Sequence, residues 1–306
     1  MKLIVSTSPH FRSRTDTASI MRDVVIALLP ALLAAVIIFE ARVLLVTGVS
    51  VIAAVLTEFL FEKACKRPVT IGDWSAVITG MLLAYNLPVT IPLWQAALGS
   101  VVSILVVKQL FGGIGCNFAN PAIVGRIVLF LSFARDMTDW TFPDGVSSAT
   151  PLAVIKAGGL ESLSLQNLFL GNIGGCLGEV SALALLIGFV YLLVRRVITW
   201  HTPVVLVGTV FVLSWVLGGS AYYALCQILS GCLLLGAIFM ATDYSTTPST
   251  RWGQVIFGLG TGLLTILIRN WGNYTEGVSF AILFMNILTP YINKWTRSKP
   301  LGGVRA

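Results

Sequence analysis

The chain of 306 residues contains few charges: Asp, Glu, Lys and Arg make up 11% of it, whereas 56% is hydrophobic. A typical soluble domain is about 25% charged. So few charged side chains cannot solvate the surface of a globule of this size, which excludes a soluble enzyme. The composition predicts an all-α polytopic membrane protein that has the lipid bilayer as its surroundings.

Histidine and paired cysteines are also scarce. The histidines are His10 and His201, and no two of the five cysteines have CxxC spacing. This pattern supports neither a zinc site nor an iron–sulfur site. We therefore predict no metal site and interpret most of the cysteines as small apolar core residues. Residues 1–22 lack an apolar core and a small-residue cleavage site, so they are predicted to be a cytoplasmic tail rather than a signal peptide.

Long apolar segments are plentiful. A membrane-spanning helix needs about 20 mostly apolar residues, and ten segments approach that length. They are 23–39, 42–61, 73–88, 91–110, 121–134, 176–194, 203–218, 221–241, 252–268 and 276–293. The sequence thus predicts ten transmembrane helices. The third and fifth are interrupted by Asn, Pro or Gly, and such broken spans are tolerated where the backbone is covered by protein or lines a cavity.

The net charge of +7 is read by position, because Lys and Arg in membrane proteins report orientation before any nucleic-acid partner, and none is expected. Fifteen basic residues fall on the side of the amino terminus: Lys2, Arg12, Arg14, Arg22, Lys63, Lys66, Arg67, Lys108, Arg195, Arg196, Arg251, Lys294, Arg297, Lys299 and Arg305. Four fall on the other side: Arg42, Arg135, Lys156 and Arg269. The asymmetry predicts cytoplasmic termini.

The predicted spans divide the chain into five parts. These are a cytoplasmic tail (1–22), a first group of five helices (23–134), an extracytoplasmic loop (135–175), a second group of five helices (176–293) and a cytoplasmic tail (294–306). Because each group holds an odd number of spans, a second copy would be inverted in the membrane, as in many transporters. Gly/Asn turns and Tyr-then-Pro endings recur at matching places in the two groups. Gly, Asn and Pro also commonly end membrane spans, so a chance resemblance between the two groups is the alternative to an inverted repeat.

The loop at 135–175 is the one long connection, and long loops in compact domains are usually functional. It contains D-G-V-S-S-A-T-P-L, from Asp144 to Leu152. On the bare sequence, Thr150 before Pro151 predicts the N-cap and first residue of a short surface helix.

The same nonapeptide is similar to the D-x-x-S-G-A-T pattern at which a flavin transferase joins FMN, through its phosphate, to a threonine hydroxyl. Further fragments occur in the order expected of one family: S-P-H, I-M-R-D-V-V-I-A-L-L-P, F-G-G-I-G-C-N-F-A-N-P-A and F-M-A-T-D-Y-S-T-T-P. Over essentially its full length the chain resembles the membrane-subunit family of the Rnf complex and of the sodium-pumping NADH:quinone reductase. One departure is Ser148, where the pattern has glycine.

The resemblance implies an electron-carrying subunit of an Rnf-type ferredoxin:NAD⁺ oxidoreductase in the bacterial inner membrane, with coupled Na⁺ or H⁺ translocation. No activity is expected from the isolated subunit. Implied partners are a flavin transferase, a second subunit with covalent FMN, subunits that carry iron–sulfur clusters or bind NADH and ferredoxin, and other membrane subunits. FMN on Thr150 is the expected cofactor, with Asp144, Ser147, Ser148 and Ala149 presenting the threonine, and a non-covalent riboflavin is a further possibility.

If the repeat holds, two related sites are expected on opposite membrane faces. The outer site would gather Tyr85, Asn270, Asn273 and Glu276 near the covalent flavin. The cytoplasmic site would gather Asn117, Asn120 and Asp243 around a second pocket.

Ionisable residues inside a span are functional candidates by default. Arg126 is the only basic residue predicted well inside one, and it serves equally well as a structural tie to broken backbone. Glu58 and Glu179 could contribute to a cation path, although Glu179 is expected rather to reach the membrane interface.

Two alternatives stay open. A secondary transporter or channel for a small solute has the same composition and the same inverted repeat. The B subunit of the sodium-pumping NADH:quinone reductase shares the core motifs, but it is similar to a chain with a longer amino-terminal extension than the 22 residues found here.

Overall fold

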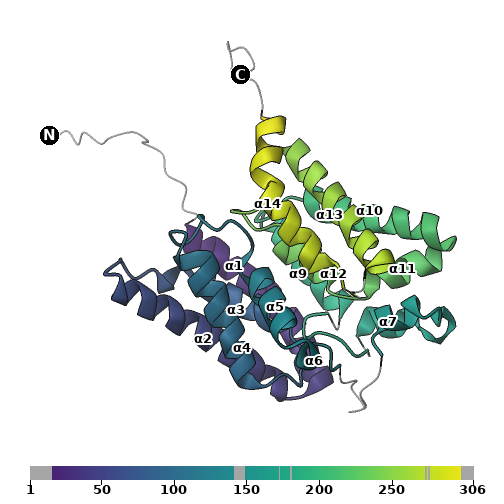
Figure 1. Cartoon of the computed structure of the whole chain (residues 1–306), viewed down its shortest axis with the longest axis horizontal. Helices are drawn as coiled ribbons and strands as arrows, with labels where there is room; N and C mark the ends of the chain where they lie inside the picture. Colours follow the sequence, from purple (N-terminus) through teal and green to yellow (C-terminus); the bar gives the residue numbers. More distant parts are fainter. Residues whose placement is uncertain are drawn as a thin grey trace, which may run out of the picture.

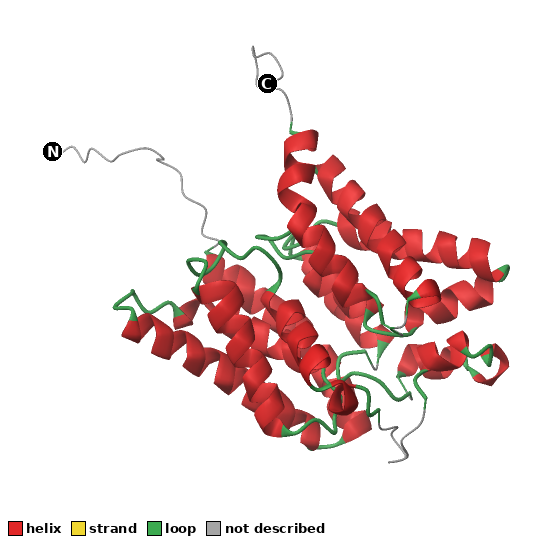
Figure 2. Ribbon diagram, viewed as in Figure 1, coloured by secondary structure: helices red, strands yellow, loops and turns green. Residues whose placement is uncertain are grey.

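The computed structural model describes residues 16–140, 149–171, 173–179, 181–272, 274 and 276–297. Over these ranges the chain is built from helices and contains no strand (Figure 2). The predicted all-α class is therefore confirmed.

The amino-terminal half contains five helical segments that coincide with the first five predicted spans. They are α1 (Thr17–Phe39), α2 (Arg42–Ala64), α3 (Ser75–Tyr85), α4 (Leu93–Val102) continued by the π-helical η2 (Ser103–Gln109), and α5 (Pro121–Ser132). A 3-10 turn, η1 (Ile71–Asp73), precedes α3. The side chain of Asn120 accepts from the backbone N–H groups of Ala122 and Ile123, and Pro121 follows it, so the predicted break before α5 is a capped helix start.

The carboxy-terminal half again has a helix in every predicted span. They are α9 (Ala182–Val194), α10 (His201–Gly218), α11 (Ala221–Leu229) followed by α12 (Leu233–Leu235) and the π-helical η4 (Gly236–Met240), α13 (Arg251–Trp271) and α14 (Val278–Thr296). Four short helices lie between the halves: α6 (Ala134–Met137), α7 (Pro151–Lys156), η3 (Leu160–Ser162) and α8 (Leu165–Leu170).

Four of these helices are long and apolar enough to cross a membrane: α1, α2, α10 and α13. A fifth candidate is α11 with Leu233–Met240, a pair bent by 69° at its break. The other apolar segments in the ten predicted positions are shorter or less hydrophobic, so a count of ten spans remains a prediction. Large side chains such as Leu33, Ile37 and Val216 are mostly exposed on the outer surface, as expected where lipid rather than water is the neighbour.

The two halves form separate groups of helices that lie side by side, with the amino-terminal group in purple to teal and the carboxy-terminal group in green to yellow (Figure 1). They meet where α1 packs against α9 and where α5 packs against α14. Helix α3 is enclosed, since ten of its eleven residues are buried. The predicted inverted relation between the halves remains a prediction.

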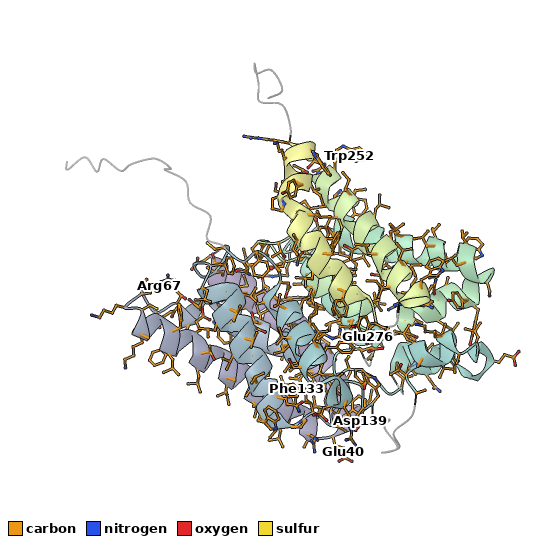
Figure 3. All side chains as sticks on the ribbon, viewed as in Figure 1. Glu40, Arg67, Phe133, Asp139, Trp252 and Glu276 are labelled. Atoms are coloured by element: carbon orange, nitrogen blue, oxygen red, sulfur yellow. The ribbon has the colours of Figure 1, made fainter. Side chains whose placement is uncertain are left out.

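The predicted assignment of loops to opposite membrane sides remains a prediction. In Figure 3, Glu40 and Asp139 lie close together at the lower edge of the view, Arg67 lies at the left edge and Trp252 lies near the top. Which face is cytoplasmic still rests on the distribution of Lys and Arg.

Candidate functional site

Thr150 stands at the start of α7. Its backbone is extended (φ −61°, ψ 155°), and its hydroxyl oxygen accepts a hydrogen bond from the N–H of Ala153 at 3.3 Å. The predicted cap, with Pro151 at the first helical position, is therefore confirmed. Thr150 is half-buried and Ala149 is exposed, so the threonine lies at the surface of the molecule.

Helix α7 is anchored to the carboxy-terminal half by two contacts. Lys156 Nζ donates to the carbonyl oxygen of Gly272 at 2.6 Å, just beyond α13. Leu152 packs so closely over Gly231 that a Cβ built there would lie 2.6 Å from Leu152 Cδ1. Thr150 therefore lies two residues from a side chain that packs on the break between α11 and α12.

An ionic centre lies where the two halves meet. Arg126 on α5 donates to Asn86 Oδ1 at 3.0 Å and to Ser279 Oγ at 2.8 Å, and it forms an ion pair with Glu276. Asn86 ends α3 and Ser279 lies in the first turn of α14, so one guanidinium joins elements from both halves. Glu276 lies between the two groups of helices in Figure 3.

The irregular segment before α9 brings a second carboxylate to this centre. Glu179 is buried, and it accepts from the N–H of Gly231 and, at 3.4 Å, from the N–H of Cys176. Gly231 has φ +75°, which glycine adopts without strain and which turns its N–H toward the carboxylate. The thiols of Cys176 and Cys232 lie beside it, 3.8 Å and 3.9 Å from Glu276 Oε1.

A second buried ion pair lies within the amino-terminal half. Lys108 Nζ on η2 lies 2.6 Å from Glu58 Oε1 on α2, and both side chains are almost wholly buried. Lys108 also donates to Ser75 Oγ at 2.6 Å, and Gln109 donates to the same carboxylate at 2.8 Å. Burial of a charge is costly unless it is paired in this way.

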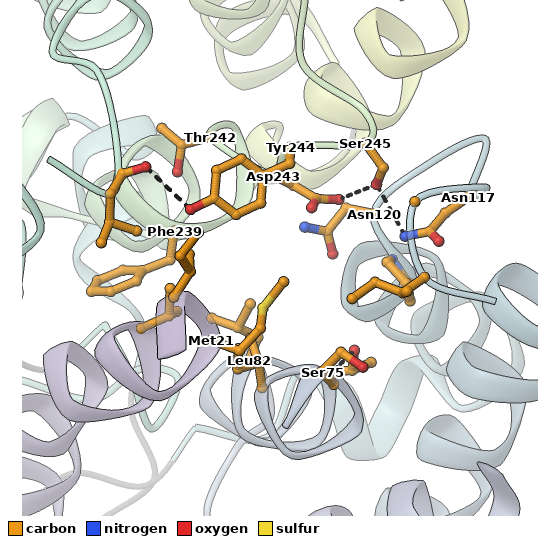
Figure 4. Close-up of a pocket in the computed structure, with 18 of the residues that line it drawn as sticks. Met21, Ser75, Leu82, Asn117, Asn120, Phe239, Thr242, Asp243, Tyr244 and Ser245 are labelled. Carbon is orange, nitrogen blue, oxygen red and sulfur yellow. Dashed lines mark hydrogen bonds between the residues drawn. The ribbon is translucent and has the colours of Figure 1, made fainter. Parts of the chain in front are cut away.

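A cavity of about 420 Å³ opens between the halves near the start of α1, within the range of small-molecule sites. Met21, Leu82 and Phe239 line one side of it, and Asn117, Asp243 and Ser245 line the other (Figure 4). The predicted convergence of Asn117, Asn120 and Asp243 on one pocket is thus observed.

The polar side of this cavity is a short hydrogen-bonded chain. Asn117 Nδ2 donates to Ser245 Oγ at 3.2 Å, and Ser245 donates to Asp243 Oδ2 at 3.1 Å. Burial raises the pKa of the Asp243 carboxyl above its usual range, while hydrogen bonds from Ser245 and Thr246 oppose the shift. The buried Oδ1 of Asn117 has no hydrogen-bond partner among the residues that the structure describes, so it can accept from a ligand.

The predicted outer site is brought together only in part. Arg126 links Glu276 with Asn86, the neighbour of Tyr85. The hydroxyl of Tyr85 itself is buried and donates to the carbonyl oxygen of Leu28 at 2.9 Å. Asn270 is half-buried in the last turn of α13. The remaining predicted site residues lie outside the described residues: Asp144, Ser147, Ser148 and Asn273.

Three charged residues were placed wrongly by the sequence. Lys108 is counted with the amino-terminal side although it falls in the predicted span 91–110, and it is buried on η2. Arg269 is counted with the other side, and it is buried and donates to the carbonyl oxygens of Gln227 and Ser230. Glu179, expected at the membrane interface, is buried inside the protein. Each lies within about one helical turn of the end of a predicted span. Span ends predicted from sequence are uncertain by a few residues, which is enough to move a residue between a loop and the core.

The cysteine cluster was also missed. Cys176 and Cys232 are 56 positions apart (232 minus 176), so no spacing motif relates them. The available signal was the glycine-rich backbone around each of them, G-N-I-G-G-C-L-G-E and S-G-C, which marks irregular chain at membrane depth.

The described part of the chain is helical, with several apolar helices and large exposed apolar side chains, so the protein is a multi-pass membrane protein. Its sequence matches the NQR2, RnfD, RnfE family over residues 4–302, and the chain belongs to that family. The resemblance found in the motifs is therefore confirmed.

Relatives are similar over almost their whole length. The D subunit of the Na⁺-translocating ferredoxin:NAD⁺ oxidoreductase complex of Acetobacterium woodii is 45% identical, covering 99% of this chain and 96% of that protein. The D subunit of the proton-translocating ferredoxin:NAD⁺ oxidoreductase complex of Clostridium ljungdahlii is 41% identical, covering 97% and 96%. The D subunit of the ion-translocating oxidoreductase complex of Ectopseudomonas mendocina is 34% identical, covering 97% and 95%.

Proposed function

We propose that the chain is the electron-carrying membrane subunit of an Rnf-type complex, with FMN joined through its phosphate to Thr150. Family membership and the names of the relatives support this function over a secondary transporter or channel. They also favour the Rnf complex over the sodium-pumping NADH:quinone reductase, because the similar proteins are named as D subunits of ferredoxin:NAD⁺ oxidoreductase complexes. The partners are then the other subunits of that complex and, during maturation, a flavin transferase.

The observation that carries the proposal is the setting of Thr150. Its extended backbone, half-exposed side chain and place at the surface suit a hydroxyl that another enzyme must reach. The anchoring of α7 by Leu152 and Lys156 would hold the attached group next to the ionic centre. When bound, the flavin supplies the redox chemistry, while the chain supplies its position and electrostatics.

The cavity beside Asp243 suits a second, non-covalent flavin, which we propose to be riboflavin. An isoalloxazine has an apolar benzenoid end and a polar pyrimidine end. Met21, Leu82 and Phe239 offer an apolar wall to the first, and the buried Oδ1 of Asn117 offers an acceptor to an N–H of the second. Asp243 and Ser245 complete that polar edge.

Translocation of Na⁺ or H⁺ would be coupled at the level of the complex. One relative is named Na⁺-translocating and another proton-translocating, at 45% and 41% identity. Similarity to these D subunits therefore does not distinguish Na⁺ from H⁺ as the translocated ion.

The attachment is tested on a denaturing gel viewed under ultraviolet light, after expression of the chain with a flavin transferase. Wild type should give a fluorescent band and Thr150→Val a dark one, because valine lacks the hydroxyl that forms the phosphoester. Thr138→Val is the matched control, since Thr138 lies in the same loop and its hydroxyl donates to the carbonyl oxygens of Ala134 and Arg135. A dark wild-type band contradicts the proposal.

The predicted orientation, with cytoplasmic termini and the Thr150 loop outside, needs a separate test. After replacement of the exposed Cys65 and Cys116 by serine, a single cysteine is introduced as Glu161→Cys or Arg251→Cys, both at exposed positions. An impermeant maleimide added to whole cells should label the first and not the second. The reverse pattern inverts the topology.

A further inference from the structure

Four side chains with metal-binding atoms converge at the junction of the two halves. They are Cys176, Glu179, Cys232 and Glu276. One ligand atom from each lies within 4.8 Å of all the others. They come from three separate segments: the irregular chain before α9, the break before α12 and the turn before α14. We propose that these four side chains bind one divalent metal ion of the zinc class.

The donor set determines the class of metal. Two thiolates and two carboxylates can form a tetrahedral site, and thiolate sulfur selects soft or borderline ions such as Zn²⁺ over Mg²⁺ or Ca²⁺. Both cysteines are free and buried, and Cys232, at the N-cap of α12, makes no side-chain capping hydrogen bond. Glu276 Oε1 and Glu179 Oε2 already face the thiols at 3.8 Å to 3.9 Å, so modest contraction would bring all four to coordination distance.

The outer surroundings are already in place. The second oxygen of each carboxylate is held by a protein donor: Arg126 for Glu276 and the N–H of Gly231 for Glu179. Arg126 Nη2 also lies 3.6 Å from Cys176 Sγ. Such outer partners fix the orientation of metal ligands and are a regular part of metal sites.

The charges balance with and without the ion. With both thiols protonated, the carboxylates of Glu179 and Glu276 are offset by Arg126 and by Arg269, whose charge acts on Glu179. When a divalent cation binds, both thiols lose their protons, so two new negative charges offset the two positive ones. The exchange of one dication for two protons leaves the buried centre neutral, which avoids the cost of placing net charge there.

One member of the cluster is partly exposed. Cys176, Glu179 and Cys232 are buried, whereas the side chain of Glu276 is 18% exposed. Ion and protons would pass on that side. Leu152 of α7 packs on Gly231, the neighbour of Cys232. A bound ion would therefore also make the contact between α7 and the break before α12 more rigid, close to Thr150.

The test is metal binding by the full-length chain, purified in detergent under reducing conditions, incubated with Zn²⁺ and desalted. We expect one zinc per chain in the wild type, none in Cys176→Ser/Cys232→Ser and one in Cys226→Ser, a buried cysteine outside the cluster. Glu179→Gln should weaken binding at least about tenfold. Because cysteine must lose its proton to bind a metal ion, binding should tighten as the pH rises.

A measurement on the wild type alone guards against misfolded variants. Zn²⁺, but not Mg²⁺, should protect Cys176 and Cys232 from alkylation in the gently denatured chain while leaving Cys226 unprotected, as read by peptide mass spectrometry. Zinc stoichiometry that survives in the double serine variant, no zinc and no protection in the wild type, or a Cys176–Cys232 disulfide in the zinc-treated chain would each overturn the proposal.

Discussion

Two buried ionic centres among the described residues differ in how many helices and loops contribute to them. Glu58 and Lys108 pair one carboxylate with one ammonium, and their further partners belong to the same half of the molecule. The centre around Arg126 draws on both halves, on two carboxylates and on two thiols. A pair completed within one half holds that half together, whereas a centre that needs both halves and irregular backbone has the properties of a site.

The largest loss of stability is expected from Arg126→Ala. It removes the ion pair to Glu276 and the hydrogen bonds to Asn86 and Ser279, and it leaves the largely buried carboxylate of Glu276 uncompensated, at a cost of about 3 kcal/mol or more. Thermal unfolding in detergent measures it. Arg126→Lys should recover only part of the loss, because an ammonium cannot reach the three partners at once. Full recovery by lysine would contradict the three-way role.

Glu58→Ala should cost nearly as much, about 3 kcal/mol, because it strands the ammonium of Lys108 in the core. The comparison is sharpened by the double variant Glu58→Gln/Lys108→Met, which removes both charges and should restore most of the stability. The corresponding Arg126→Met/Glu276→Gln should not, since Glu179 would keep its charge with one guanidinium fewer nearby. If both double variants recovered the same share of the lost stability, the proposed difference between the two ionic centres would be wrong.

Gly231→Ala should cause an intermediate loss of stability, about 1–3 kcal/mol. The backbone there has φ +75°, and the new Cβ would lie 2.6 Å from Leu152 Cδ1 and 2.7 Å from Arg269 Nη2. Gly208→Ala on α10 is the matched control, because its Cβ would meet nothing within 4 Å. The midpoint of thermal unfolding should fall for the first and stay constant or rise for the second.

The smallest effect is expected from Arg195→Gln. Its guanidinium binds Asp23 with two nitrogens, yet the Arg195 side chain is 52% exposed. Water and salt screen such a pair, so its net contribution is small. The shift in unfolding midpoint should be too small to resolve beside that of Arg126→Ala, and a comparable shift would show that burial does not separate these ion pairs.

The helices themselves could be predicted because apolar composition is a local property. Every predicted span contains a helix, and the caps at Asn120 and Thr150 follow from their own residues and the prolines after them. Asn117, Asn120 and Asp243 line one pocket, as expected from the span-ending residues that recur in the two halves. The contents of the central site were not, because contacts among Arg126, Cys176, Cys232 and Glu276 depend on how separate segments pack.

The charges at span ends show the same limit. Lys108, Glu179 and Arg269 belong to the core rather than to loops, since each finds an opposite charge, a backbone N–H or a set of carbonyl oxygens there. Hydropathy alone places such residues at the nearest boundary. Partners such as Glu58, Gly231 and Ser230, which lie 39 to 52 positions away along the chain, hold these side chains in the core.

The most direct test of the electron-carrying role is the partition of flavin after denaturation of the purified complex. We predict that wild type retains one flavin on this polypeptide and releases a second from it. Thr150→Val should lose only the retained flavin, and Asn117→Leu, which fills the polar edge of the cavity, should lose only the released one. Retention of flavin by Thr150→Val, or a wild-type polypeptide that retains none, would contradict the account.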